Sequence, residues 1–243
     1  MSEIILKMSG VTKKYGSKAA VDNISMTIYK GDIYGLIGRN GAGKTTLMRV
    51  ITSLTSIDSG KIALFGETSA ARLTKARRRM GCVIETPALY PNLTAFQNLE
   101  YFRILRRIDD KSIVEKSLKT VALEDTGKKK FRDFSLGMKQ RLGLALALLG
   151  NPDFIILDEP NNGLDPIGIV EMRETILRLC KEQGITIMIS SHVLSELSMT
   201  ATRYGIINNG KLIKEMTNNE LKAQSEMGSN LENYFVSIIR EDK

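Results

Sequence analysis

The segment "GRNGAGKTT", residues 38–46, places three glycines, one lysine and two threonines directly after the apolar run "IYGLIG". It fits the pattern G-x-x-x-x-G-K-[ST], with Gly38, Gly43, Lys44 and Thr45 at the specified positions. Glycines let a backbone wrap around a phosphate with its N–H groups pointing inward, and a helix that begins near Lys44 adds its positive N-terminal end. We therefore expect this turn to hold the phosphates of a nucleotide, rather than to be a flexible loop with an incidental lysine.

Several positions of the loop have an expected role at the nucleotide. Lys44 places an ammonium group on the terminal phosphates, and Thr46 adds a phosphate hydrogen bond. The Thr45 hydroxyl is a candidate ligand for Mg²⁺, an ion that keeps several waters and needs few protein ligands. The predicted nucleotide-binding residues of the loop are Gly38, Arg39, Asn40, Gly41, Ala42, Gly43, Lys44, Thr45 and Thr46.

Polar side chains follow two further apolar runs. Asp158 and Glu159 end "FIILDEP", and His192, the one histidine of the chain, follows "ITIMISS". Ligands collect at the carboxyl ends of parallel strands, so Asp158 is predicted to hold Mg²⁺ through a water and Glu159 to polarise the attacking water. His192 is predicted to reach the terminal phosphate. The alternatives are a helix N-cap for the two acids and an ordinary surface position for the histidine.

Composition narrows the class of protein. The chain has 243 residues, 42% of them hydrophobic, and it contains no run of eighteen apolar residues and no secretory signal pattern. Cys82 and Cys180 lack metal-ligand spacing, which favours a reduced, cytosolic protein. The net charge of +8 is concentrated in "KARRRM" (75–80) and "GKKKFR" (127–132). These clusters are typical of solvated surface. The alternatives are a nucleic-acid-binding patch and a face near anionic lipid. No aromatic residues are interleaved with the charges, which argues against a site where single-stranded nucleic acid stacks on aromatic rings.

Hydrophobic periodicity predicts an α/β fold with a mostly parallel sheet. The phosphate-loop motif makes this the core of a P-loop NTPase. An N-terminal antiparallel β subdomain precedes the loop, and an α-helical subdomain is inserted later. We expect residues 1–85 and 135–215 to form the core, 86–134 the helical insertion, and 216–243 a tail of small, loosely packed helices. Gly184 is predicted to stop a long helix, and Asn208-Asn209-Gly210 to form a hairpin turn.

The order of these motifs resembles the ATP-binding subunit of ATP-binding-cassette (ABC) transporters over roughly residues 3–215. "GRNGAGKTT" is similar to the Walker A loop, "FIILDE" to the Walker B strand, and "NGLD" (162–165) to the D-loop. "FSLGMKQR" (134–141) lies where the family carries its LSGGQ signature. The resemblance implies that Tyr15 stacks on adenine, that Asp165 faces a dimer partner, and that His192 is the switch histidine.

The resemblance also implies an ATPase cycle with partners. ATP and Mg²⁺ are the expected cofactors, Lys44, Glu159 and His192 the expected catalytic residues, and Thr45, Asp158 and Glu85 the expected metal site. A head-to-tail homodimer would place Ser135 and Gly137 of one subunit on the γ-phosphate held by the other. Separate transmembrane permease subunits would dock near "TPALYPNL" (86–93), with Leu89, Tyr90 and Leu93 as the wall of a groove. The expected location is the cytoplasmic face of the cell membrane, and no nucleic acid is expected.

Two departures from the family pattern point to a narrower group. Leu136 and Met138 replace a Gly and a Gln of the signature, and Glu85 stands where the family normally has Gln. An ionised Glu only accepts hydrogen bonds, whereas Gln also donates. In these features the chain resembles the ATP-binding subunits of exporters that protect bacteria from bacitracin or lantibiotic peptides. We expect Glu85 to be a coupling residue that meets Mg²⁺ or its water; a plain surface glutamate is the alternative.

Two other functions stay open on the sequence. One is an ABC ATPase that acts on nucleic acid or ribosomes, which the basic clusters permit but the single Walker A loop disfavours. The other is a nucleotide-gated binding module that hardly hydrolyses, which the altered signature and Glu85 permit. The cargo of a transporter contacts its membrane subunits, so this sequence carries no direct pattern for the transported molecule.

Overall fold

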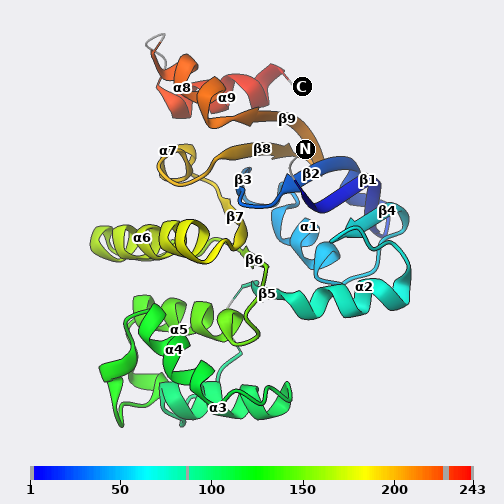
Figure 1. Cartoon of the computed structure of the whole chain (residues 1–243). Helices are drawn as coiled ribbons and strands as arrows, with labels where there is room; N and C mark the ends of the chain where they lie inside the picture. Colours follow the sequence, from blue (N-terminus) through cyan, green and yellow to red (C-terminus); the bar gives the residue numbers. More distant parts are fainter. Residues whose placement is uncertain (1–2, 86–87, 227–229, 242–243) are drawn as a thin grey trace.

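The computed structural model of the chain describes residues 3–85, 88–226 and 230–241. Two sheets and the surrounding helices form the body of the molecule, and a group of helices extends from one end of it (Figure 1). The strands are β1 (Ile4–Tyr15), β2 (Lys18–Tyr29), β3 (Ile33–Ile37), β4 (Ser59–Leu64), β5 (Met80–Val83), β6 (Phe154–Leu157), β7 (Thr186–Ser191), β8 (Arg203–Asn208) and β9 (Lys211–Thr217).

The helices alternate with the strands in the core. They are α1 (Lys44–Ile51), α2 (Ala70–Ala76), α3 (Ala95–Leu105), α4 (Ser112–Thr120), α5 (Leu136–Leu148), α6 (Pro166–Gln183), α7 (Leu194–Ser198), α8 (Asn218–Glu226) and α9 (Leu231–Glu241). Short 3₁₀ turns are η1 (Arg77–Arg79), η2 (Glu124–Thr126) and η3 (Phe131–Asp133).

The larger sheet has the strand order β5-β6-β7-β3-β8-β9, and all its neighbours are parallel except β8 and β9. Every residue of β3, β6 and β7 is buried, as expected for central strands of a parallel sheet that is covered on both faces. This confirms the predicted α/β fold with a mostly parallel sheet. The order also places β7 between β6 and β3, so the ends of these three strands lie side by side.

The smaller sheet is antiparallel, with the order β2-β1-β4, which confirms the predicted N-terminal β region. Its buried face shares one hydrophobic cluster with helix α1 and with the larger sheet. Leu47, Met48 and Ile51 of α1 are fully buried in that cluster. Helix α1 is therefore held between the two sheets, and this fixes the loop that precedes it.

Helices α3 and α4 lie in the segment predicted as a helical insertion, and together with α5 they form the group at the bottom of Figure 1. Helix α3 begins with a capping box, in which Thr94 and Gln97 satisfy each other's backbone N–H groups. Residues 86 and 87, where the insertion is predicted to begin, lie outside the described residues.

The predicted turns are confirmed, and the prediction for the tail is wrong in one respect. Gly184 ends α6 in the left-handed conformation, with φ of 67°. Asn209 and Gly210 both have positive φ in the turn between β8 and β9, as a two-residue hairpin requires. Helix α9, expected to pack loosely, buries Phe235 and Ile238 and contacts α7.

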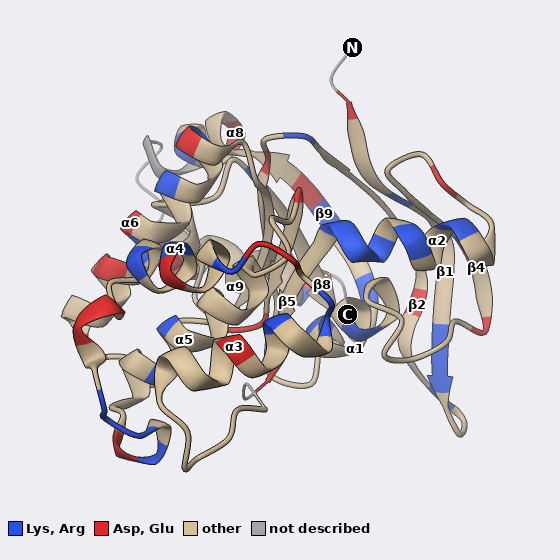
Figure 2. Ribbon diagram, turned by 60° about the horizontal axis from the view of Figure 1, so that its bottom comes forward, with Lys and Arg blue, Asp and Glu red and all other residues tan. Residues whose placement is uncertain are grey.

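The basic cluster at residues 75–80 is partly satisfied inside the molecule. Arg77 Nε donates to the carbonyl oxygen of Ile51 at 3.0 Å, and Arg79 forms a 2.7 Å ion pair with Asp153. Figure 2 shows Lys and Arg positions on α2, and Asp and Glu positions on neighbouring strands and loops. Among the residues described here, no helix combines the length and the apolar character needed to cross a membrane.

Candidate nucleotide site

The loop between β3 and α1 has a backbone that only glycine accommodates at two positions. Gly43 has φ of 113°, and a Cβ there would lie 2.3 Å from the carbonyl oxygen of Ala20. A Cβ on Gly38 would lie 2.6 Å from the carbonyl oxygen of Ile207. These close approaches explain two of the glycines in the sequence pattern, and Asn40, Gly41 and Gly43 of the loop line an open cavity.

Lys44 begins helix α1, and its side chain is only 5% exposed. Its ammonium group donates to the carbonyl oxygen of Gly38 at 2.7 Å and lies 3.0 Å from Oε1 of Glu159. A buried cation needs such partners, because an unpaired buried charge is strongly unfavourable. The ammonium is thus fixed at the mouth of the loop, where the terminal phosphates of a nucleotide would lie.

Asp158 follows β6 and accepts two side-chain hydrogen bonds. Thr45 Oγ1 donates to Oδ2 at 2.7 Å, and Ser190 Oγ donates to Oδ1 at 2.6 Å. Ser190 lies on β7 and also accepts from the backbone N–H of Glu159 at 2.9 Å. One serine hydroxyl therefore orients both neighbouring carboxylate residues.

Glu159 has φ of 47°, which is uncommon for a residue other than glycine and is a mark of functional sites. This conformation turns the chain sharply at the strand end. The carboxylate lies between two nitrogen atoms: Nζ of Lys44 at 3.0 Å and Nδ1 of His192 at 3.2 Å. Glu159 therefore contacts both of the other predicted catalytic residues.

A cavity of about 540 Å³ adjoins this cluster and is large enough for a nucleotide. Its lining includes most of the predicted loop residues and Tyr15, whose side chain is 52% exposed. Of the predicted set, the lining residues are Tyr15, Asn40, Gly41, Gly43, Lys44, Thr45, Thr46 and Glu159. The β8–β9 turn contributes Asn209 and Gly210, and Gly210 donates its N–H to the carbonyl oxygen of Ala42 at 2.8 Å.

Thr45 and Asp158 offer the donor set that Mg²⁺ prefers. Both side chains supply oxygen atoms, and these lie 2.7 Å apart beside Lys44. Mg²⁺ is usually bound by one or two protein oxygens, with phosphate oxygens and water completing its shell. No group of three or more metal-ligating His, Cys, Asp or Glu side chains occurs in the described ranges. The residues fit an ion that arrives with the nucleotide.

Glu85 lies at a different point from the other predicted metal ligands. Its side chain is 59% exposed, its φ is 61°, and its carboxylate forms a 2.7 Å ion pair with Arg49. Arg49 lies in the last turn of α1, the helix that starts at Lys44. The contacts of Glu85 thus join it to the far end of the phosphate-loop helix, and none of its contacts is with Thr45 or Asp158.

Ser135, Gly137 and Asp165 form a second location, outside the lining of the nucleotide cavity. The hydroxyl of Ser135 caps α5 by accepting from the N–H of Met138 at 3.2 Å, and Asp165 caps α6 by accepting from Gly168 at 2.8 Å. The two caps are neighbours: a Cβ on Gly163 would lie only 2.7 Å from a methyl group of Leu136. The structure therefore brings the "FSLGMKQR" and "NGLD" segments together.

Sequence reasoning missed Ser190, and it predicted the β8–β9 turn without assigning it to the nucleotide cavity. The strand "ITIMISS" shows two serines before His192, but nothing local distinguishes the serine that reaches the acids. Only the sheet order places β7 beside β6 and so brings Ser190 to Asp158.

Known proteins are similar to this chain in sequence and in fold. The sequence profile described as "ABC transporter" matches residues 21–162. The bacitracin transport ATP-binding protein BcrA of Bacillus licheniformis is 47% identical over 221 residues, which cover 91% of this chain and 72% of that protein. The lantibiotic transport ATP-binding protein SrtF of Streptococcus pyogenes is 42% identical over 239 residues, which cover 98% of this chain and 99% of that protein.

Two solved structures extend the comparison to the fold. The dimeric post-hydrolysis state of the ATP-binding cassette MJ0796, bound to ADP and Pi, is 26% identical with a TM-score of 0.78, covering 88% of this chain and 99% of that chain. CbiO1 from Clostridium perfringens, described as part of the ABC transporter complex cbiONQ, is 27% identical with a TM-score of 0.83, covering 93% of each chain.

Proposed function

Since this chain belongs to the ABC transporter family and is an ATPase, we propose that it powers the export of a lantibiotic or similar antimicrobial peptide and so confers resistance or self-immunity. The observation that carries the enzymatic part is the contact of Lys44, Glu159 and His192 beside the phosphate loop. The names of the bacitracin and lantibiotic relatives support the peptide class. No observation on the described residues favours action on nucleic acid or ribosomes.

The proposed roles follow from the contacts of each residue. Residues 38–46 hold the phosphates, Tyr15 stacks on the base, and Thr45 and Asp158 hold Mg²⁺, which would neutralise charge on the phosphate oxygens. Lys44 exchanges the carboxylate of Glu159 for a phosphate oxygen when the nucleotide binds. Glu159 then accepts a proton from the attacking water, and His192 orients that carboxylate and contacts the γ-phosphate.

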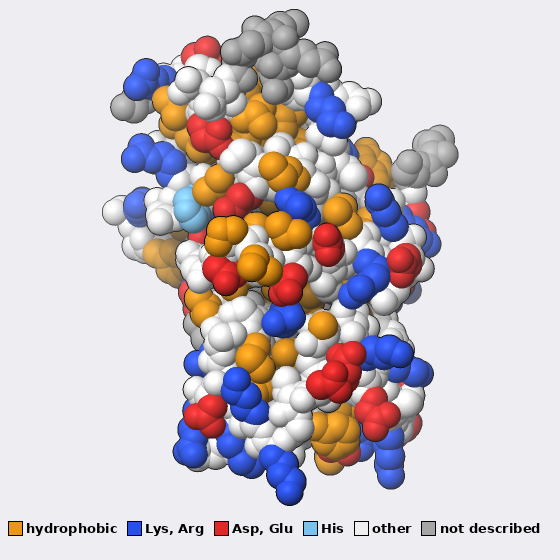
Figure 3. Space-filling view, turned by 90° about the vertical axis from the view of Figure 1, so that its left-hand side faces the viewer, with side chains coloured by type: hydrophobic (Ala, Val, Ile, Leu, Met, Phe, Trp, Pro, Cys, Tyr) orange, Lys and Arg blue, Asp and Glu red, His pale blue; other side chains and the backbone are white. Residues whose placement is uncertain are grey.

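We propose a homodimer in the ATP-bound state, with Ser135, Gly137 and Asp165 facing the partner subunit. Exposed apolar side chains lie next to these residues: Leu136 is 47% exposed and Ile167 is 70% exposed. Figure 3 shows hydrophobic side chains gathered across the middle of one face, with the histidine near them. A γ-phosphate that contacts both subunits would stabilise the closed dimer, because those charge-assisted bonds exist only in that state.

We propose that the permease subunits are separate chains that dock beside the helical insertion, at the cytoplasmic face of the membrane. Leu89 is buried and Tyr90 is 44% exposed, with its ring 4.8 Å from that of Tyr101. Tyr101 and Phe96 of α3 are also exposed, at 42% and 45%, so an apolar surface is available there. Thr86 and Pro87, the start of the predicted docking stretch, lie outside the described residues. In this proposal, residues 1–85 and 135–215 act as the core, 86–134 as the docking unit and 216–243 as the tail.

The decisive test is Glu159→Gln in the complex with its permease subunits. The variant should bind ATP as the parent does but hydrolyse it about 100- to 10,000-fold more slowly, because the amide cannot accept the proton. Glu174→Gln, at an exposed position of α6, is the matched control and should keep normal turnover. Normal steady-state hydrolysis by Glu159→Gln would show that another residue is the base.

The peptide class is tested separately in cells that express the complete transporter. The parent should raise the inhibitory concentration of bacitracin or of a lantibiotic, and Glu159→Gln should abolish the effect. Resistance that is equal with and without the transporter, across a panel of such peptides, would contradict the proposed cargo while leaving the ATPase assignment intact.

A further inference from the structure

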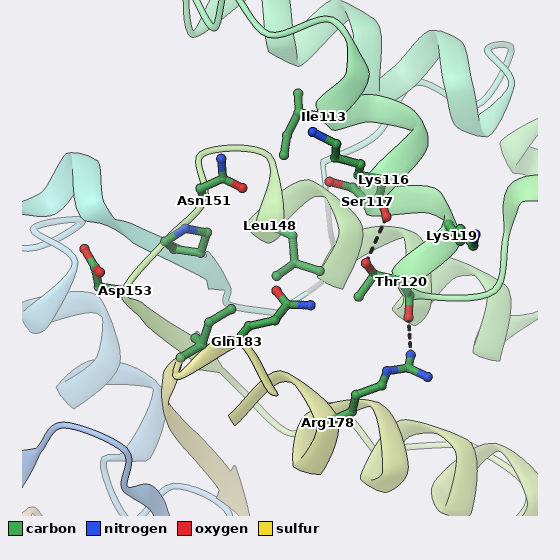
Figure 4. Close-up of a pocket in the computed structure, with 12 residues that line it drawn as sticks. Ile113, Lys116, Ser117, Lys119, Thr120, Leu148, Asn151, Asp153, Arg178 and Gln183 are labelled. Atoms are coloured by element: carbon green, nitrogen blue, oxygen red, sulfur yellow. Dashed lines mark hydrogen bonds between the residues drawn. The ribbon is translucent and has the colours of Figure 1, made fainter. Parts of the chain in front are cut away.

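A second pocket lies far from the nucleotide cavity, where the helical insertion meets the core (Figure 4). Its volume is about 680 Å³, within the range of pockets that hold drug-sized molecules. One wall is helix α4, and the opposite wall is the C-terminal half of α6. The floor comes from the end of α5, the loop 151–153 and Ile185, which directly precedes β7. No residue of the proposed ATPase mechanism lines this pocket.

The inner part of the pocket is apolar, and one unsatisfied hydroxyl lies behind its lining. Ile113, Leu148 and Ile185 are 4%, 6% and 5% exposed and form the apolar surface. Ser117 is 3% exposed, and its Oγ has no hydrogen-bond partner among the described residues. Buried hydroxyl groups are normally paired, but this oxygen has less than 1 Å² of accessible surface, so it lies behind the apolar lining and does not open onto the cavity. Figure 4 shows Ser117 on the side of α4 that faces Asn151 and Leu148.

The rim of the pocket is positively charged. Lys116, Lys119 and Arg178 are cations at the rim, and Asp153 is the acid. Lys116 is paired with Asp110 at 3.5 Å, and Asp153 is paired with Arg79 at 2.7 Å. In the described part of the chain, Lys119 and Arg178 have no carboxylate within ion-pair distance. Two uncompensated positive charges therefore remain at the mouth.

Arg178 has a further contact that ties the two walls together. Its Nη2 donates to the backbone carbonyl oxygen of Thr120 at 2.6 Å, which links α6 to the end of α4 (Figure 4). A guanidinium has five donor N–H groups in a planar fork, so this bond leaves others for an acid group. The same pocket thus combines an apolar interior and a cationic rim.

We propose that this pocket is a binding site for a small amphipathic anion. The apolar body of the ligand lies against Leu148 and Ile185, and its acid group lies between Lys119 and Arg178. Because the pocket walls come from the insertion and from the core, the bound ligand holds α4 against α6. This inference stands on the pocket residues alone and does not depend on the exported peptide.

The test uses anilinonaphthalene sulfonate, whose aromatic body and sulfonate match the proposed chemistry and whose fluorescence rises in an apolar pocket. Excess ADP fills the nucleotide site in every sample. The neutral N-phenylnaphthylamine, which lacks the sulfonate, is the matched probe. The variants are Lys119→Gln, the double variant Lys119→Gln/Arg178→Gln, and the control Lys222→Gln, which removes a cation from α8 at the other end of the molecule.

The double variant should raise the Kd for the sulfonate about tenfold, and Lys119→Gln alone about threefold, since each exposed ion pair contributes modestly. The Kd for the neutral probe should stay within about twofold, and the control should match the parent. Should both probes bind all variants with the parent's affinity, the rim charges would have no part in binding and the proposal would be overturned.

A further measurement locates the site. Hydrogen exchange should slow on addition of the sulfonate at the amides of residues 112–120 and 178–185; protection confined to other segments would overturn the assignment.

Discussion

Replacing Ser190 by alanine should weaken both the fold and the hydrolysis of ATP, although this serine does not line the nucleotide cavity. The side chain is fully buried on β7. Its hydroxyl donates to Asp158 at 2.6 Å and accepts from the N–H of Glu159 at 2.9 Å. Ser190→Ala removes both bonds at once, and the small alanine side chain cannot replace them.

The magnitude follows from the two groups that lose their partner. Leaving a buried polar group unsatisfied costs about 1–3 kcal/mol, so the free energy of unfolding should fall by about 2–4 kcal/mol. Loss of a group that orients metal and catalytic ligands typically lowers metal affinity or activity about 10- to 100-fold. We expect a fall of this size in kcat, together with a higher Mg²⁺ concentration for half-maximal activity.

The assay compares Ser190→Ala with Ser191→Ala, the next residue of the same strand. Ser191 is also buried, but its hydroxyl accepts from the N–H of Val193 at 3.0 Å and contacts neither acid. Steady-state ATPase rates are measured over a Mg²⁺ titration, and stability is measured by urea unfolding. If both variants had the same kcat and the same Mg²⁺ dependence, the idea that Ser190 orients the two carboxylates would be refuted.

Three other variants test the loop, the ion pair and the core. Gly43→Ala should lower ATP affinity at least about tenfold more than Gly41→Ala. The reason is that a Cβ at Gly43 would lie 2.3 Å from the carbonyl oxygen of Ala20, whereas one at Gly41 would meet nothing within 4 Å. Equal affinities of the two variants, measured by titration calorimetry, would contradict this prediction. Glu85→Ala, which breaks the 2.7 Å pair with Arg49, should reduce peptide resistance and transporter ATPase activity more than Glu85→Gln, which can keep a hydrogen bond. If peptide resistance and ATPase activity were unchanged in both variants, Glu85 would have no coupling role. Burial raises the pKa of Tyr204 from 10.0 to about 12, so the stability from its neutral phenol is complete below pH 10 and is lost as the pH rises toward 12. Urea midpoints should therefore fall more steeply above pH 10 in the parent than in Tyr204→Phe, and parallel curves would contradict the effect.

The nucleotide cavity was predictable because its signals are local. The glycines of the loop, the acids after "FIIL" and the histidine after "ITIMISS" each follow an apolar run, and a parallel sheet brings the ends of such strands to one edge. The antiparallel N-terminal region and the hairpin at Asn209-Gly210 were likewise predictable from short-range patterns.

What the sequence could not predict depends on which elements become neighbours. Ser190 reaches Asp158 only because β7 pairs with β6, and β4 completes the small sheet by pairing with β1 across about fifty residues. The ion pair of Glu85 joins a strand end to helix α1, and no spacing rule connects these positions. The tail was predicted as loosely packed because its apolar patches are short, yet Phe235 and Ile238 of α9 are buried.

The central claim is that Lys44, held at the mouth of the loop, binds the terminal phosphates of ATP, and titration calorimetry on Lys44→Ala tests it most directly. The parent and the variant are titrated with ATP and with AMP at fixed Mg²⁺. Loss of charge-assisted bonds of about 1.5–3 kcal/mol should weaken ATP binding about 10- to 100-fold, and AMP affinity should stay nearly unchanged. ATP affinity equal to that of the parent would contradict the account.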